Sequence, residues 1–240
     1  MMLGEARPPA GMRLYAIGDV HGRDDLLAAV HDAVDADLRL RPAGAHRLIH
    51  VGDYVDRGPD SAGVIRRLAR LSATDPDVVC LCGNHDERML AFIDDPVAEG
   101  RLFFANGGGA TLASYGINGA APAGDEDVTD RGNALREAMP DSDLAFLRNL
   151  KLMARFGDYL FVHAGIRPGV PLDAQDPHDL MWIRADFLND PRDHGVVVVH
   201  GHTPVPRPDI RANRIDIDTG AFNTGNLTCL VQEGTDWRLL

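Results

Sequence analysis

Lysine, cysteine and long apolar runs are scarce or absent in this chain of 240 residues. The chain has three cysteines, Cys80, Cys82 and Cys229. Three is a small and odd number, which argues against a disulfide framework, so we expect buried thiols in a reducing compartment. No apolar run reaches membrane-spanning length, and residues 1–11 are too short and too polar for a secretory signal. We therefore expect a cytoplasmic protein with no membrane partner.

Positive charge is also in short supply, because the formal net charge is -12 at pH 7. Such an acidic chain repels the backbone of nucleic acids, which argues against a nucleic-acid partner. Lys151 is the only lysine, and the Gly-Lys-Ser/Thr loop of Walker-type nucleotide sites is absent. The remaining positive side chains are arginines, which suit bidentate contacts with phosphate. Any phosphate chemistry must then depend on local arginines.

Three early stretches share one plan, in which an apolar run, a polar loop and an amphipathic helix follow each other. The apolar runs are residues 13–17, 48–51 and 78–82. Repeated strand-loop-helix units predict a largely parallel sheet, with its functional loops at the carboxyl ends of the strands. The chain is long enough to bury a sizeable core, and it shows no linker, so we expect a single domain over residues 1–240.

The later part of the chain reads mostly as strands. We expect a hairpin around Gly157-Asp158 and strands of a second sheet at residues 214–218 and 227–232. Residues 118–130 are rich in Ala, Gly and acidic side chains, and we expect an exposed excursion there. The whole pattern predicts an α/β protein with a two-layered β core and helices on its outer faces.

Carboxylate, imidazole and amide side chains follow the predicted strands, and the set is Asp19, His21, Asp53, Asn84, His163 and His202. One isolated Asp-x-His pair is more often a turn than a metal site, but all these loops should converge at one edge. A set of oxygen and nitrogen donors without thiolate suits two divalent ions. One carboxylate must bridge ions about 3.5 to 4 Å apart. Asp53 is the predicted bridge, because it follows the middle strand of the first three units.

Two further histidines need separate treatment. His200 lies two residues before His202, so strand alternation could put both on one side, but Gly201 interrupts the strand. We favour His202 as the ligand, and His200 as a residue that either supports the ligands or has a structural role. His50 precedes the Asp53 loop, and we expect it to be a packed neighbour.

Five motifs in this order resemble those of calcineurin-like metallophosphoesterases, and more narrowly the compact bacterial and phage-type members of the phosphoprotein phosphatase family. They are Gly18-Asp19-Val20-His21-Gly22, Gly52-Asp53-Tyr54-Val55-Asp56-Arg57-Gly58, Gly83-Asn84-His85-Asp86, His163-Ala164-Gly165 and Gly201-His202-Thr203-Pro204. The resemblance covers residues 13 to about 225. It extends to Asn106-Gly107-Gly108, Trp182-Ile183-Arg184 and Asp218-Thr219-Gly220-Ala221-Phe222. It departs at Asp86, where protein phosphatases often have Glu.

The resemblance implies a role for each motif residue. Asp19 and His21 would hold one metal together with Asp53. The other metal would also be bound by Asp53, together with Asn84, His163 and His202. His85 would act as general acid, oriented by Asp56. Arg57 and Arg184 would clamp the phosphoryl oxygens. The bacterial relatives suggest manganese, and the ligand types also suit iron or zinc.

The resulting expectation is a two-metal phosphomonoester hydrolase, which removes phosphate from phosphoserine or phosphothreonine, with phosphotyrosine as a further substrate. The expected reaction is direct attack by a metal-bridging hydroxide. The alternative is a bis(5'-nucleosyl)-tetraphosphatase, because relatives with these motifs cleave diadenosine tetraphosphate. A noncatalytic scaffold is the third candidate, and it is disfavoured because the ligands, His85 and both arginines are retained.

Overall fold

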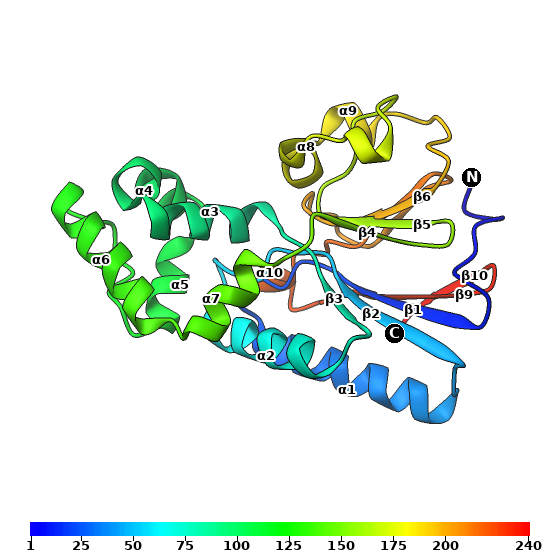
Figure 1. Ribbon diagram of the computed structural model, residues 1–240, viewed down its shortest axis with the longest axis horizontal. Coiled ribbons are helices and arrows are strands. Elements are labelled where there is room, and N and C mark those ends of the chain that lie inside the picture. The colour runs from blue at the N-terminus through cyan, green and yellow to red at the C-terminus, as the bar shows by residue number, and fades with distance from the viewer.

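The computed structural model describes residues 1–240 and contains two five-stranded sheets stacked on each other (Figure 1). The first sheet has the order β10-β9-β1-β2-β3, with β1 at Met12–Ile17, β2 at Ala45–His50, β3 at Val78–Cys80, β9 at Cys229–Glu233 and β10 at Asp236–Leu239. The second has the order β4-β5-β6-β8-β7, with β4 at Met153–Phe156, β5 at Tyr159–Val162, β6 at Val197–His200, β7 at Asp209–Ile210 and β8 at Arg214–Asp216. The predicted two-layered β core is confirmed.

The three early strands are parallel neighbours, as their repeated plan predicts. Ile17 pairs with His50, and His50 pairs with Cys80, so the three strands end side by side. β2 lies between β1 and β3, which places the loop that carries Asp53 in the middle. The predicted hairpin is also present, because β4 and β5 pair antiparallel across Gly157-Asp158.

The predicted sheet is wrong for one strand. β9, predicted at residues 227–232 in the second sheet, pairs antiparallel with β1 in the first, whereas β8 does join the second. Leu230 packs between the sheets, while Cys229 and Val231 face the helices. A strand buried on both faces suits either sheet, so its composition does not reveal its partner.

Ten helices flank the sheets. They are α1 at Asp24–Leu40, α2 at Ser61–Thr74, α3 at Asn84–Asp94, α4 at Pro96–Ala105, α5 at Gly108–Ser114, α6 at Asp125–Ala138, α7 at Asp141–Arg148, α8 at Pro177–Trp182, α9 at Ala185–Leu188 and α10 at Ala221–Thr224, with a 3-10 turn at Leu172–Ala174. α1 and α2 lie along the first sheet, α8 and α9 lie on the second, and α3 to α7 gather at one end (Figure 1). No helix is long and apolar enough to cross a bilayer.

The expected excursion at residues 118–130 is only partly correct. α6 begins at Asp125, inside that segment, and Val128 is buried in the core between helices and sheet. A Cβ on Gly100 would lie 2.6 Å from Cγ1 of Val128, so α4 and α6 approach closely there. One apolar anchor in a polar stretch was too weak a signal to predict this helix.

The core lies on both faces of the first sheet. In β1, Leu14 and Ala16 point between the sheets, whereas Tyr15 and Ile17 point toward the helices, as the two-residue period of a strand requires. Because both faces are buried, polar side chains gather in the loops at the carboxyl ends of the strands.

Candidate metal centre

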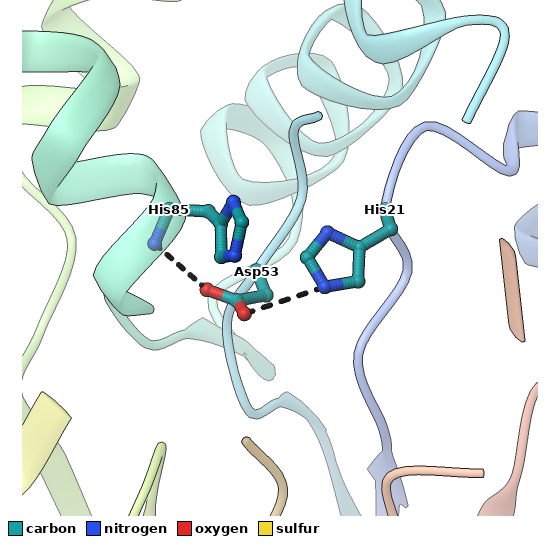
Figure 2. Close-up of side chains that lie close together, drawn as sticks. All are labelled: His21, Asp53 and His85. Carbon is teal, nitrogen blue, oxygen red and sulfur yellow. Dashed lines mark hydrogen bonds and ion pairs between the residues drawn. The ribbon is translucent and has the colours of Figure 1, made fainter. Parts of the chain in front are cut away.

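The loops after five strands bring the predicted donors together. Two groups of side chains are close enough to hold a metal ion, one made by His21, Asp53 and His85 and the other by Asp53, His163 and His202. In each group, one ligand atom per residue lies within 4.8 Å of the others. Asp53 belongs to both groups, and Figure 2 shows its carboxylate between His21 and His85.

Asp53 divides its two oxygens between the two sides. Its Oδ2 lies 3.4 Å from Nε2 of His21, and its Oδ1 lies 3.4 Å from Nε2 of His163. Asn84 is also present, because its Oδ1 lies 3.0 Å from Nε2 of His163 and 2.8 Å from Nδ1 of His202. The geometry therefore has two halves that share one carboxylate.

Backbone carbonyls fix the imidazoles in this arrangement. Nδ1 of His21 lies 2.7 Å from the carbonyl oxygen of Val55, and Nδ1 of His163 lies 3.0 Å from that of Val51. A carbonyl only accepts, so each Nδ1 carries the proton and each Nε2 presents a lone pair toward Asp53. Such partners orient the histidine ligands of metal sites.

Asp19, a further predicted ligand, lies outside both groups, and only one of its oxygens has a hydrogen-bond partner. Its Oδ2 accepts the backbone N–H of His202 at 3.0 Å, whereas its Oδ1 is buried and has no hydrogen-bond partner. A Cβ on Gly201 would lie 2.0 Å from that Oδ1, so only glycine permits this approach. An unpaired carboxylate oxygen is costly inside a protein, and a bound cation would satisfy it.

The backbone of the centre is strained. Five non-glycine residues of the chain have positive φ angles, and all five belong to the predicted site: His21 at 43°, Asp53 at 53°, Asp56 at 71°, Arg57 at 67° and His202 at 69°. Left-handed backbone is uncommon for residues other than glycine and concentrates at functional sites. The strained residues thus all lie within the predicted site, and three of them are members of the donor groups.

Burial and neighbouring charges shift the pKa values of the groups in the centre. The pKa of Asp19 rises well above its ordinary range because it is buried and faces the charges of Asp218 and Asp53. Burial lowers the pKa of His21 and of His202 to about 3, so both imidazoles are neutral. Burial also opposes ionisation of Asp53, but the surrounding imidazoles lower its pKa overall. Neutral imidazoles coordinate divalent cations, and a cation beside Asp19 would favour the ionised form of its carboxylate.

His85 lies in the first group and is the imidazole there that pairs with a second carboxylate, that of Asp56. Its Nδ1 lies 2.7 Å from Oδ2 of Asp56, and its backbone N–H donates to Oδ1 of Asp53 at 3.0 Å. Burial would lower the pKa of His85, but the charges of Asp53 and Asp56 and the hydrogen bond to Asp56 raise it overall. This imidazole can therefore carry a proton when its neighbours cannot.

Both predicted arginines reach the centre. Arg57 donates from Nη1 to Nε2 of His21 at 2.9 Å and from Nη2 to Nε2 of His85 at 2.8 Å. Arg184 donates from Nε to Nε2 of His202 at 3.0 Å. One guanidinium thus lies at each half, where two cations can face an anionic substrate.

Sequence reasoning missed the partners that hold these loops. The hydroxyl of Thr111 donates to Oδ1 of Asp56 at 2.7 Å and accepts from its backbone N–H at 2.9 Å. The carbonyl of Gly107 accepts from the backbone N–H of Arg57 at 3.2 Å, so the glycine-rich segment before α5 is part of the site. The match of Asn106-Gly107-Gly108 to the family motifs is the available signal, but it does not reveal which residue these glycines contact.

Asp86 and the two extra histidines have structural surroundings. Asp86 accepts the backbone N–H groups of Gly83, Asp53 and Tyr54 at 3.0, 2.9 and 2.9 Å, so it holds the central loop. His200 is buried outside both donor groups, with Nδ1 3.0 Å from the carbonyl oxygen of Gly201. His50 is also buried, as expected, and its Nε2 lies 2.9 Å from that of His31.

A β-sandwich whose strand ends gather imidazoles and carboxylates around one shared aspartate defines a class of metal-dependent hydrolases. The model of the calcineurin-like phosphoesterase family matches residues 12–221, and the chain belongs to that family. It is thus a metal-dependent phosphoesterase, as the motifs predicted.

Relatives and solved structures agree with this assignment. The chain is 27% identical over 240 residues to the asymmetrical bis(5'-nucleosyl)-tetraphosphatase PrpE of Bacillus mycoides (strain KBAB4), with 91% of this chain and 90% of the relative covered. It is 32% identical to the symmetrical bis(5'-nucleosyl)-tetraphosphatase of Methylococcus capsulatus (strain ATCC 33009 / NCIMB 11132 / Bath), but that match spans 65% of this chain and 44% of the relative.

Two solved structures share the fold at low sequence identity. The metallophosphoesterase from Sphaerobacter thermophilus superposes with a TM-score of 0.52 at 18% identity, over 96% of this chain and 88% of that one. The cold-active protein-tyrosine phosphatase of a psychrophilic Shewanella species has a TM-score of 0.57 at 15% identity, over 99% and 84% of the two chains. At these identities the likeness concerns the fold alone.

Proposed function

We propose that this protein hydrolyses dinucleoside tetraphosphates at a centre of two divalent metal ions. The observation that carries the reaction class is the position of Asp53, which divides its oxygens between two groups of imidazoles. The substrate class is supported by the names of the relatives, one of which is similar over nearly its whole length. This substrate was the alternative expectation, and the comparisons favour it over phosphoserine or phosphothreonine.

The residues present fit the two ions. Asp19 and His21 would hold one ion with Asp53, and the other ion would be held with Asp53 by the remaining predicted ligands, Asn84, His163 and His202. The unpaired, buried Oδ1 of Asp19 is the observation that supports this fit. When bound, two divalent ions activate water near neutral pH and neutralise phosphoryl charge. We propose manganese as their identity.

The remaining groups bind the phosphates and move the proton. Arg57 and Arg184 would turn from the imidazoles to the phosphoryl oxygens of the substrate. When Arg57 leaves Nε2 of His85, that nitrogen is free to carry a proton. His85, held by Asp56 through Nδ1, would then donate this proton to the departing phosphate oxygen.

The test compares two substrates on one preparation. Purified protein with manganese is assayed for kcat/KM on diadenosine tetraphosphate and on a phosphoserine peptide, and its metal content is measured in parallel. We expect a clear preference for the dinucleotide and about two ions per chain. A preference for the peptide would restore the protein phosphatase, and metal binding without turnover of either substrate would support the scaffold.

A further inference from the structure

Aromatic side chains lie at both ends of the row of metal donors. The ring of Phe222, on α10, lies 5.5 Å from that of His21, and the ring of Trp182, at the end of α8, lies 6.2 Å from that of His202. His21 and His202 belong to different donor groups that share Asp53. In Figure 1, α8 lies on the outer side of the second sheet, whereas α10 lies on the other side of that sheet, beside the ends of the strands. The two rings therefore flank the centre from opposite sides.

The Phe222 flank is a single exposed ring that is held firmly. Phe222 is 36% exposed, and it alone among the exposed large apolar residues contacts the donors. Arg23 donates to the carbonyl of Ala221 at 3.0 Å, and left-handed glycines, Gly220 and Gly225, close both ends of α10. Cζ of Arg57 lies 5.1 Å from the ring centre, so the ring adjoins a group directed at phosphate. A cavity of about 560 Å³, lined by Phe222 and Arg23, opens beside it.

The Trp182 flank consists of Trp182 and His178, whose rings are stacked 6.0 Å apart with 15° between their planes. Trp182 donates from Nε1 to Glu87 at 3.0 Å, and Cζ of Arg88 lies 5.3 Å from its ring centre. His178 is exposed, so it offers the outer face of the pair. Trp182 and His178 line a cavity of about 370 Å³.

We infer that the Phe222 flank and the Trp182 flank each bind one nucleoside of the substrate, while the polyphosphate lies across the donors between Arg57 and Arg184. Aromatic faces stack on nucleobases of any sequence, and arginines beside them favour the adjoining phosphates. A molecule with a planar group at each end of a phosphate chain matches the sequence of aromatic flank, metal donors and aromatic flank. The inference rests on the proposed function, since it requires a dinucleoside polyphosphate.

The decisive experiment measures kcat and KM for diadenosine tetraphosphate in Phe222→Ala and His178→Ala. Loss of one stacking contact should raise KM about tenfold in each variant, whereas kcat should change by less than about twofold. Phe222→Tyr, which keeps the ring, should restore the KM of the wild type. Trp237→Ala is the matched control, because Trp237 is similarly exposed, at 41%, but lies on β10 away from the site, and its kinetics should equal those of the wild type.

A substrate with one nucleoside provides an independent test, which uses the wild-type protein and so does not depend on whether a variant folds. Adenosine 5'-tetraphosphate fills one flank only, so its KM in the wild type should exceed that of the dinucleotide about tenfold. Equal KM values for these two substrates, or variants whose KM is unchanged, would overturn the inference while leaving the proposed function intact. A wild type that does not cleave diadenosine tetraphosphate would overturn both.

Discussion

The two ends of strand β1 carry clusters of charged side chains, and these charges are neutralised within the chain at one end only. At its amino end, the Arg13 cluster consists of Arg13, Tyr15, Asp37, Glu233 and Arg238. Asp37 accepts hydrogen bonds from the hydroxyl of Tyr15 at 2.7 Å, from Arg13 at 3.2 Å and from Arg238 at 2.6 Å. Every charge there meets its opposite within the chain.

At the carboxyl end of the same strand, the metal centre gathers carboxylates and neutral imidazoles instead. The pKa of Asp218 rises to about 6 because of burial and the nearby charge of Asp53, and burial and the charges of Asp218 and Asp53 raise the pKa of Asp19 well above its ordinary range. Arg57 and Arg184 are the positively charged side chains that contact the imidazoles of the centre. A structural cluster is complete in itself, whereas a binding cluster leaves a charge for something else to neutralise.

Asp53→Asn should have the largest effect on the metal centre, because it removes the carboxylate shared by both halves. Turnover should fall at least about a thousandfold, since the two ions contribute several kcal/mol to transition-state stabilisation. Metal analysis of the purified variant should show loss of bound ions, and manganese should no longer raise its melting temperature. Full metal content in the variant would show that Asp53 is not the bridge.

Asp37→Asn tests the other end of β1. It keeps the shape of the side chain but removes the buried counter-charge of Arg13, which is 3% exposed and would keep only the half-exposed Glu233, so the free energy of unfolding should fall by about 3 kcal/mol. Metal content should stay unchanged. Asp94→Asn is the control, because Asp94 and its partner Arg148 are about half exposed and should contribute less than about 1 kcal/mol.

The same cluster predicts a pH dependence. Burial opposes ionisation of Asp37, but hydrogen bonds from Tyr15 and Arg238 outweigh it and lower its pKa below 3.8. Stability from this carboxylate is therefore present above its ordinary pKa and is lost as the pH falls through the lowered value. Urea titrations of wild type and Asp37→Asn should converge in that acid range. A constant difference down to the lowest pH would contradict the assignment.

His85→Asn should lower turnover of diadenosine tetraphosphate about a hundredfold while both metals remain bound, because His85 supplies a proton rather than a ligand. The loss should be larger on an alkyl phosphomonoester, whose departing alkoxide is a stronger base than a departing phosphate. Rates on both substrates and metal analysis of the same preparation test this prediction. A variant that loses both metals would show that the role of His85 is different.

Asp19→Asn gives the smallest effect and the sharpest contrast with Asp37→Asn. Because the fold raises the pKa of Asp19, its ionised form destabilises the metal-free protein at neutral pH. The variant should gain about 1 kcal/mol of stability in the presence of a chelator and bind manganese more weakly. Calorimetry with and without the metal measures both quantities. Lower stability in the chelator would mean that Asp19 is neutralised within the chain.

The convergence of the donors was predictable because parallel strands end at one edge, and Ile17, His50 and Cys80 are lateral neighbours one to three residues before three of the motifs. Thr111 was not predictable, since a threonine in a helix carries no sign that it will bond to Asp56, 55 residues away in the chain. The sheet that contains β9 was also beyond reach, because a strand buried on both faces fits either layer.

The five left-handed residues of the centre have a consequence for protein engineering. Each costs roughly 1 to 3 kcal/mol in backbone conformation, and glycine would adopt the same angles without that cost. The positions where this chain could most readily be made more heat-resistant are therefore the ones it needs for its reaction. Stabilising substitutions that preserve activity should therefore be sought in helices α3 to α7 and in exposed loops. A screen that selects for stability alone would enrich inactive proteins.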